Sequence, residues 1–413
     1  MSLIVQKYGG TSVGSAERIR NVAARLLETQ REDNDVVAVI SAMSGVTDNL
    51  LKLASEVLPH SSGSAREMDA LLATGEQTSI ALVAMAVNAL GGKAISLTGA
   101  QAGIVTDRAH TRAKIANINP KLIEELLSDG YIVVVAGFQG RTVDGETTTL
   151  GRGGSDLTAI ALAGALGADA CQIFTDVDGV FSCDPRVVPD ATQMREIAYD
   201  ELLEMAGAGA KVMQSRAVEF AKKFGVPFEV RSSLNRKEGT IAREETASME
   251  DVVIRGITIE RKQAKITMAG VPDAPGTASR IFSAVSAANI LVDMIVQNAS
   301  DQNTTDISFT IHEADLPQAE KLLAPVVAEI KAERLVAQNG VAKLSVVGIG
   351  MRSHAGVATR LFACLGQGGV NIQLISTSEI KIAVVIDEAE ADRAVQLTHV
   401  EFGLARAGGL GVV

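Results

Sequence analysis

The sequence contains no tryptophan, and aromatic residues make up only 3% of its 413 residues. Its cores must therefore be built mainly from Ala, Val, Leu and Ile. The three cysteines, Cys171, Cys183 and Cys364, match no spacing typical of a metal site or a disulfide framework. Cysteines without such a spacing indicate a reducing compartment, in which these thiols only pack against their neighbours. We therefore expect a cytoplasmic protein with no bound metal cluster.

Positive charge is also scarce, because 38 Lys and Arg residues face 49 Asp and Glu residues, for a net charge of −11. This balance argues against nucleic acids and anionic membranes as partners, but it leaves room for a local basic pocket. The N-terminus has no basic segment followed by an apolar core, so no signal peptide is expected. No apolar run is judged long enough to cross a bilayer.

Hydrophobic residues make up 47% of the chain, and the length is typical of two or three domains. Up to about residue 230, apolar segments alternate with segments of helical periodicity, which predicts an α/β fold with a mostly parallel sheet sandwiched by helices. Strands are expected at 2–7, 36–42, 93–99, 131–138, 170–175 and 227–232. Helices are expected at 15–30, 47–58, 64–90 in two pieces, 119–129, 155–167, 198–206 and 212–224.

Glycine-rich and polar loops follow the predicted strands, and the carboxyl ends of parallel strands meet at one edge of a sheet, so we expect one pocket there. The first loop, "KYGGTSVG" (7–14), lies between a strand and a helix that Ser15 can cap. Its backbone N–H groups can approach an anion closely. The lysine precedes the glycines, unlike the P-loop pattern. Lys7 is a candidate for stabilising phosphoryl oxygens, against the alternative of a solvated surface lysine.

A second loop, "GRGGSD" (151–156), places Arg152 between glycines, where its forked guanidinium suits a carboxylate. Ser155 and Asp156 open the next helix, whose N-terminus adds N–H donors. Glu76, in "TGEQTS", is expected just before a helix. It can cap that helix or bind an ammonium group, and the residues alone favour the cap. Ser41 and Thr47 can cap a helix or hold a substrate carboxylate, and both alternatives stay open.

A third stretch, "TDVDGVFSCDPR" (175–186), lacks the spacing of a calcium loop and is better interpreted as part of a nucleotide pocket. Thr175 and Asp176 end a strand, Arg186 can reach phosphate, and Lys211 offers a second positive charge. Glycine loops with two lysines and an arginine suit phosphoryl transfer, which depends mainly on alignment and on positive charge.

The C-terminal part contains an internal repeat, because 270–297 matches 348–376 with a shift of 80 residues that pairs Gly276 with Gly356 and Arg280 with Arg360. Each copy is expected to belong to a βαββαβ unit of the ferredoxin-like type. The predicted domains are the α/β domain at 1–232, a linker at 233–265, and two ferredoxin-like domains at 266–340 and 341–413. The C-terminal segment is a candidate for completing the first ferredoxin-like domain.

Together these motifs resemble aspartokinase, of the short monofunctional bacterial type with paired ACT domains, over nearly the whole chain. "KYGGTSVG" is specific to that family rather than to the wider amino-acid-kinase fold. The resemblance implies transfer of the γ-phosphate of Mg-ATP to the β-carboxylate of L-aspartate, giving 4-phospho-L-aspartate. It also implies that this is the first step toward lysine, threonine, methionine and diaminopimelate, with feedback by lysine, threonine or both.

The resemblance also implies residue roles. Lys7 would stabilise the transferred phosphoryl group, Asp156 would orient the lysines, and Lys211 and Arg152 complete the catalytic set. Glu76 would bind the amino group of aspartate and Arg152 a carboxylate. The remaining substrate residues would be Ser41, near the phosphates, and Thr47, Gly153, Gly154 and Ser155. The nucleotide site would be lined by Lys7, Tyr8, Gly9, Gly10, Thr175, Asp176, Phe181, Arg186, Lys211 and Val212. Phe181 stands where many relatives have tyrosine.

For regulation, the resemblance implies a homodimer formed through the ACT domains, with lysine and threonine bound at their interfaces; a tetramer is an alternative. Effector residues would be Asp273, Ala274, Gln297, Val357, Ala358, Asn371, Ile372 and Glu379. Met249 resembles an internal start for a separate regulatory subunit. Two other interpretations are a sister amino-acid or carbamate kinase and a non-catalytic amino-acid sensor.

Overall fold

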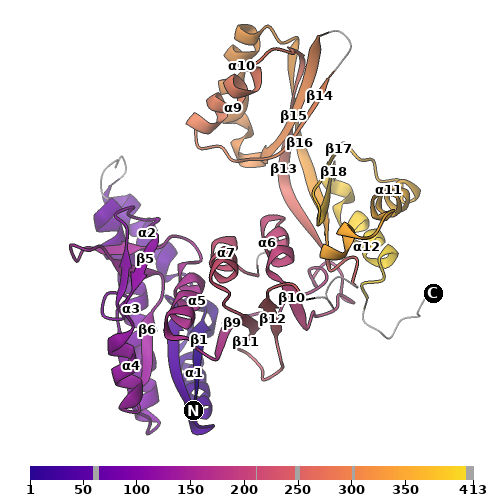
Figure 1. Ribbon diagram of the computed structural model, residues 1–413. Helices are drawn as coiled ribbons and strands as arrows, with labels where there is room; N and C mark the ends of the chain where they lie inside the picture. Colours follow the sequence, from indigo (N-terminus) through magenta and orange to yellow (C-terminus); the bar gives the residue numbers. More distant parts are fainter. Residues whose placement is uncertain (59–64, 211, 247–251, 300–302, 406–413) are drawn as a thin grey trace. The chain divides into compact units, whose positions relative to one another are not determined.

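The computed structural model describes residues 1–58, 65–210, 212–246, 252–299 and 303–405 (Figure 1). The chain forms two compact units. The first contains residues 1–180, 193–206 and 211–246, and the second contains 181–192, 207–210 and 247–413. The segment 181–192 therefore belongs to the second unit, although it lies within the range predicted for the catalytic domain.

The first unit is built on an eight-stranded sheet in which all neighbouring strands are parallel except β11 and β12. A mostly parallel sheet was predicted, and this prediction is confirmed. The order across the sheet is β10 (Glu196–Ala198), β12 (Thr240–Arg243), β11 (Phe228–Ser232), β9 (Ala170–Thr175), β1 (Ser2–Tyr8), β2 (Asn34–Ile40), β6 (Ile132–Ala136) and β3 (Ala94–Leu97). Strand β12 lies in the segment predicted as a linker, so that part of the linker prediction is wrong.

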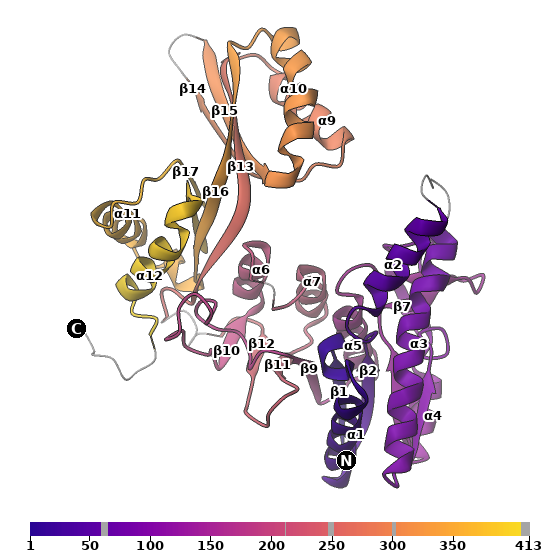
Figure 2. The same ribbon diagram turned by 180° about the vertical axis from the view of Figure 1, so that it is seen from behind.

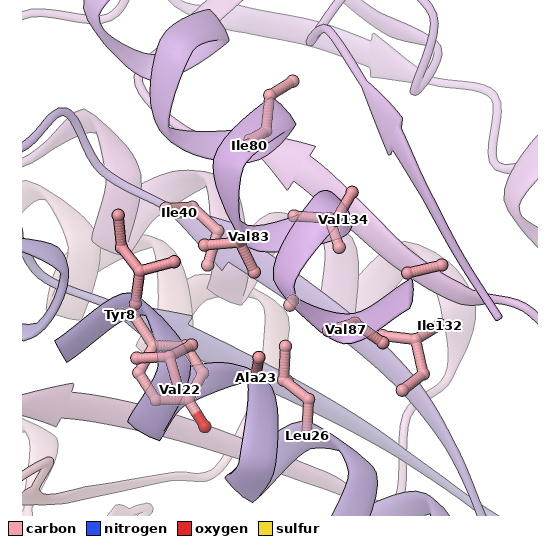
Figure 3. Close-up of a cluster of buried hydrophobic side chains, with 14 of the residues drawn as sticks. Tyr8, Val22, Ala23, Leu26, Ile40, Ile80, Val83, Val87, Ile132 and Val134 are labelled. Atoms are coloured by element: carbon pink, nitrogen blue, oxygen red, sulfur yellow. The ribbon is translucent and has the colours of Figure 1, made fainter. Parts of the chain in front are cut away.

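Helices α1 (Ala16–Arg31) and α3 (Ala65–Ala89) pack against each other and contribute to one buried apolar cluster with strands of the sheet (Figure 3). Tyr8, Leu26 and Val83 lie in this cluster and are fully or almost fully buried. Helix α5 (Gly154–Leu166) contacts β1 and β9. Because successive side chains of a strand point to opposite faces, Lys7 points away from the cluster that holds Tyr8 and toward α5.

Shorter elements complete the first unit. A four-stranded sheet of order β5 (Ile115–Ile118), β4 (Ile104–Thr106), β7 (Gln139–Arg141) and β8 (Thr147–Thr149) was not predicted, since strands of three or four residues are too short to show a period. The remaining elements are the 3-10 turn η1 (Gly10–Val13) and the helices α2 (Val46–Val57), α4 (Lys121–Ser128), α6 (Tyr199–Gly207) and α7 (Ser215–Phe224).

Helix α3 is one continuous helix of 25 residues, and the prediction of two pieces is wrong. It passes through Gly75, where a side chain would be too close to its neighbour: a Cβ there would lie 2.9 Å from that of Ala42. By length and composition, α3 is the one helix of the described residues that could cross a membrane. Half of the apolar stretch of α3 is buried inside the protein, and residues such as Val83 lie in the buried cluster. Helix α3 is therefore a core helix that packs against the sheet.

The second unit holds a six-stranded sheet of order β14-β15-β13-β16-β18-β17, with all neighbours antiparallel. Its strands are β13 (Gly256–Pro272), β14 (Val292–Ala299), β15 (Thr304–His312), β16 (Arg334–Val347), β17 (Leu374–Thr377) and β18 (Lys381–Asp387). Its helices are α9 (Thr277–Ala287), α10 (Leu316–Ile330), α11 (Val357–Gln367) and α12 (Ala391–Glu401). Helices α9 and α10 pack together, as do α11 and α12 (Figures 1 and 2).

The two halves of this unit repeat the same local structure. Gly276 and Gly356 precede α9 and α11, each with a φ of 91°. Arg280 pairs with Glu329 on α10, and Arg360 pairs with Glu401 on α12. The long strands β13 and β16 are shared between the halves, because residues 256–260 pair with 343–347 and residues 265–269 pair with 334–338. The first part of β13 thus supplies a strand to the second repeat.

Candidate active site

The glycine loop after β1 is held against β9 and against the loop that follows β2. Gly9 N–H donates to the carbonyl of Phe174 at 3.2 Å, and Ser44 N–H donates to the carbonyl of Gly10, also at 3.2 Å. A Cβ on Gly10 would lie 2.7 Å from the carbonyl oxygen of Ala42, too close for any side chain. A Cβ on Gly9 would instead lie 3.5 Å from Lys7 Nζ, an ordinary contact. The two glycines therefore bring backbone close to the lysine and to the neighbouring loop.

Lys7 and Asp156 form a nearly buried ion pair. Lys7 Nζ lies 2.6 Å from Asp156 Oδ1, and the two side chains are 11% and 13% exposed. Asp156 lies in the first turn of α5, where a carboxylate also suits the positive end of the helix. This ion pair fixes the ammonium end of the flexible lysine side chain near the C-terminal end of β1.

A cavity of about 220 Å³ opens beside this ion pair. Nine of the residues that line the cavity were singled out in the sequence analysis, and they come from four separate stretches of the chain. The residues that line the cavity are Lys7, Ser41, Thr47, Glu76, Phe138, Arg152, Gly153, Gly154, Ser155 and Asp156. The helix-capping alternative for Thr47 is wrong, because α2 has Gly45 at its N-cap and no side chain caps it.

Glu76 lies deep in this cavity, in the interior of α3, so its interpretation as an N-terminal cap is wrong. Its Oε1 accepts a hydrogen bond from Ala42 N–H at 3.1 Å. Its Oε2 is buried and has no hydrogen-bond partner among the described residues. Burial raises the pKa of Glu76 to about 7, although the Ala42 N–H opposes this shift. A cation in the cavity would satisfy the unpartnered oxygen.

Phe138 is the cavity residue that the sequence analysis did not select. It has a φ of 68°, which is rare for a bulky residue. Its N–H donates to Thr158 Oγ1 at 3.2 Å, and its carbonyl accepts from Leu150 N–H at 2.8 Å. Phe138 is the last residue of the strand predicted at 131–138, and nothing in the sequence distinguishes it from a core residue.

The residues of the first unit that were predicted to line the nucleotide site differ in their burial and in their contacts. The side chain of Tyr8 is fully buried and stacks on Phe174 with ring centroids 4.7 Å apart, so only its backbone can reach a ligand. Thr175 Oγ1 donates to Asp176 Oδ1 at the end of β9. Val212 is half-buried shortly before α7. Lys211 lies outside the described residues.

Phe181 and Arg186 belong to the second unit. Phe181 packs against the apolar cluster of the second repeat. Arg186 Nη2 lies 2.7 Å from Asp184 Oδ2, and its side chain is largely exposed. Their assignment to the nucleotide site stays a prediction.

Most of the predicted effector residues are exposed on the second unit. Asp273 and Ala274 lie between β13 and α9, and Gln297 lies on β14. Val357 is buried at the start of α11, where Ala358 is half-buried. The others, between α11 and β18, are Asn371, Ile372 and Glu379, and the last lies 3.6 Å from Arg352 Nε. Met249 lies outside the described residues.

Comparison with known proteins identifies the class first. Residues 2–232 match the amino acid kinase family, and residues 266–325 and 344–402 match the ACT domain. The fold and the cavity therefore belong to an amino acid kinase that carries ACT domains.

Individual relatives identify the family within this class of kinases. The aspartate kinase of Pseudomonas fluorescens is 51% identical over 405 residues, covering 98% of both chains. Two crystal structures of E. coli aspartokinase III are 25% identical over 97% of this chain and 99% of theirs. The complex with aspartate and ADP has a TM-score of 0.77, and the complex with lysine and aspartate has one of 0.78. The chain belongs to the aspartate kinase family, whose members are kinases.

Proposed function

We propose that the chain transfers the γ-phosphoryl group of ATP to the β-carboxylate of L-aspartate, giving 4-phospho-L-aspartate and ADP. The observation that carries this proposal is the cavity that Lys7, Glu76 and Arg152 line together. The positive charges of Lys7 and Arg152 and the carboxylate of Glu76 suit a small amino acid that carries two carboxylates and one ammonium group. The E. coli relative was solved with aspartate and ADP, which supports the same ligand pair here.

In the proposed reaction, a β-carboxylate oxygen of aspartate attacks the γ-phosphorus as the bond to the bridging oxygen of ADP breaks. The attacking carboxylate is already ionised at neutral pH, so the step needs no general base. The chain contributes alignment and charge. Arg152 holds a carboxylate, Glu76 holds the ammonium group, and Lys7, oriented by Asp156, stabilises the charge on the transferred group.

We assign the phosphate side of the site to the glycine loop, with Gly9 and Gly10 against the phosphates and Ser41 beside them. Mg²⁺ is proposed to enter bound to the phosphates of ATP, since it usually keeps several waters and binds through substrate phosphates with one or two carboxylates. The described residues contain no group of three or more His, Cys, Asp or Glu side chains that could hold a metal. The residues proposed for the nucleotide side remain Thr175, Asp176, Phe181, Arg186, Lys211 and Val212.

We also propose that the product feeds synthesis of lysine, threonine, methionine and diaminopimelate in the cytoplasm, and that lysine, threonine or both inhibit the enzyme. The ACT domains of a homodimer would bind these effectors, and the E. coli relative was solved with lysine. Inhibition requires that an effector bind an inactive arrangement more tightly than the active one. Rates measured with each effector alone and together test this, and an unchanged rate under every condition would refute it.

Trapping the acyl phosphate with hydroxylamine tests the proposed reaction directly. Incubation with Mg-ATP and L-aspartate should give aspartyl hydroxamate, and omission of either substrate should abolish it. A sister kinase would form product only with another acceptor, and a non-catalytic sensor would form none. Absence of hydroxamate from a folded full-length chain would refute the proposal.

A further inference from the structure

The turn that carries Arg152 is built from residues that do not fix their own conformation. It connects β8 to α5, and Gly151 and Gly153 on either side of Arg152 have φ values of 77° and 73°. Glycine can adopt this left-handed conformation without strain, but it also has the most conformational freedom to lose. Arg152 itself is exposed and has no ion pair among those in the described residues. Contacts from elsewhere must therefore hold the turn in place.

Arg216, on α7, supplies one such contact from outside the cavity. Its Nη1 donates to the carbonyl of Leu150 at 2.5 Å, and its Nη2 donates to the carbonyl of Ala113 at 2.7 Å. Leu150 directly precedes Gly151, while Ala113 belongs to the strap 110–113 that runs beside the turn. One planar guanidinium thus ties two separate chain segments in a fixed geometry.

The strap is itself anchored to the core by Asp69 of α3. Asp69 is fully buried and accepts hydrogen bonds from Thr111 N–H at 3.0 Å and from His110 Nδ1 at 2.8 Å. The hydroxyl of Thr149, the last residue of β8, donates to the same carboxylate. Because the strap is fixed, its contact with Arg216 can hold the turn still.

Gln214, the N-cap residue of α7, also restricts the turn. A Cβ on Gly153 would lie 1.9 Å from Gln214 Cγ, so the side chain of Gln214 occupies the space beside this glycine. Arg216 and Gln214 therefore contact the turn on both sides of Arg152, while neither lines the cavity.

We propose that Arg216 is a positioning residue for aspartate binding, which acts by holding the Arg152 turn. This inference rests on the proposed role of Arg152. Arg216→Ala should raise KM for aspartate about tenfold, the size expected when charge-assisted hydrogen bonds to a binding loop are lost. KM for ATP should change less than about twofold, because Arg216 does not contact the glycine loop.

A double-mutant cycle tests the inference in the full-length enzyme. KM for aspartate is measured for the parent, Arg216→Ala, Arg152→Ala and the double variant. If Arg216 acts through Arg152, adding Arg216→Ala to Arg152→Ala should raise KM by less than about twofold, whereas independent effects would multiply. Lys223→Ala removes an exposed cation from the same helix and is the matched control, with KM expected to stay within about twofold of the parent.

The outcomes separate this inference from the proposed function. If Arg152→Ala raises KM for aspartate but Arg216→Ala does not, only the inference fails. An unchanged KM in Arg152→Ala refutes the role assigned to Arg152 and the inference with it. Two results would show that Arg216 has only a general structural role. One is an equal effect of Arg216→Ala on KM for aspartate and for ATP. The other is an effect on KM for aspartate in the double variant that equals the product of the two single effects. If Arg216→Ala does not fold, the cycle is run with Arg216→Lys, which keeps the charge and loses the fork.

Discussion

Lys7 Nζ lies 2.6 Å from Asp156 Oδ1, so the C-terminal end of β1 and the first turn of α5 meet in one ion pair. The lysine is a preorganised positive charge beside the cavity. Lys7→Met should lower kcat by about 100-fold or more, by analogy with the loss of one preorganised donor to a developing charge. Steady-state kinetics of the purified chain measure the effect.

Lys52→Met is a suitable control for this variant, because Lys52 is an exposed lysine on α2. Its kcat should stay within about twofold of the parent. Asp156→Asn should lower kcat by a smaller factor than Lys7→Met, since the lysine then keeps its charge but loses its partner. Nearly unchanged turnover in Lys7→Met would refute the role assigned to this residue.

The raised pKa of Glu76 predicts how aspartate use depends on pH. Burial raises this pKa to about 7, so the side chain is largely neutral below that pH and charged above it. Only the charged form pairs with an ammonium group. The kcat/KM for aspartate should therefore rise with pH through about 7 and then level off, as this parameter reports on the free enzyme. Glu76→Gln should have a low value without that rise.

Ionisation of Glu76 should have the opposite effect on stability: the contribution of this carboxyl group to the free energy of unfolding should fall as the pH rises. The pKa in the folded protein lies above the ordinary value of 4.5, so protonation of Glu76 favours the folded state. That contribution is fully present below about 4.5 and is lost as the pH rises through about 7. The difference in free energy of unfolding between the parent and Glu76→Gln should shift in favour of Glu76→Gln across this window. A constant difference in urea titrations would contradict the assigned pKa.

The sequence predicted much of this site because its residues lie in loops with strong local signals. Lys7 precedes two glycines, and Arg152 lies between glycines at the start of an apolar helix. Since parallel strands end at one edge, a pattern of strand, loop and helix is enough to bring such loops together. The ion pair between Lys7 and Asp156, however, depends on which face of β1 meets α5, and local pattern does not determine this.

Other features could not be predicted for physical reasons. Glu76 was misplaced because a glycine normally weakens a helix, whereas Gly75 is accommodated here by the close approach of Ala42. Phe138 lines the cavity in an unusual backbone conformation, and Arg216 donates to a carbonyl group 66 positions away in the sequence. No local pattern encodes either feature. The division of β13 between two repeats depends on pairing with β16 between residues more than 60 positions apart in the sequence, which no local periodicity encodes.

Gly9 and Gly10 should respond differently to substitution by alanine. A Cβ on Gly10 would lie 2.7 Å from a backbone carbonyl, so Gly10→Ala must displace the loop after β2 and should lower Tm. A Cβ on Gly9 meets nothing closer than 3.5 Å, and the φ of −70° suits any residue. Gly9→Ala should therefore keep Tm within about 2 °C of the parent, a shift that corresponds to about 1 kcal/mol at most for a unit of this size.

Activity distinguishes the two variants further. The new methyl group of Gly9→Ala would lie beside Lys7 Nζ, where the phosphates are proposed to bind, and should raise KM for ATP about tenfold. Thermal unfolding and ATP kinetics of both variants check the prediction. A lower Tm for Gly9→Ala, or a normal KM for ATP in that variant, would be evidence against close approach of phosphate to this backbone.

Lys343 links three strands of the antiparallel sheet in the second unit through an ion-paired cluster. Its side chain is 3% exposed on β16, and its Nζ lies 2.8 Å from Glu260 on β13 and also contacts Asp293 on β14. Burial lowers the pKa of Lys343, but the two carboxylates outweigh burial and raise it overall. Lys343→Met would remove the charge and leave two carboxylates facing each other.

We expect Lys343→Met to lower the free energy of unfolding by about 2 kcal/mol. Loss of one partner of a buried pair costs about 3–5 kcal/mol, and the loss is smaller here because both carboxylates are partly exposed to water. Adding Asp293→Asn should recover part of the loss. Urea titrations of the parent, Lys343→Met and the double variant measure these differences. A double variant no more stable than Lys343→Met would mean that packing, not charge, explains the loss.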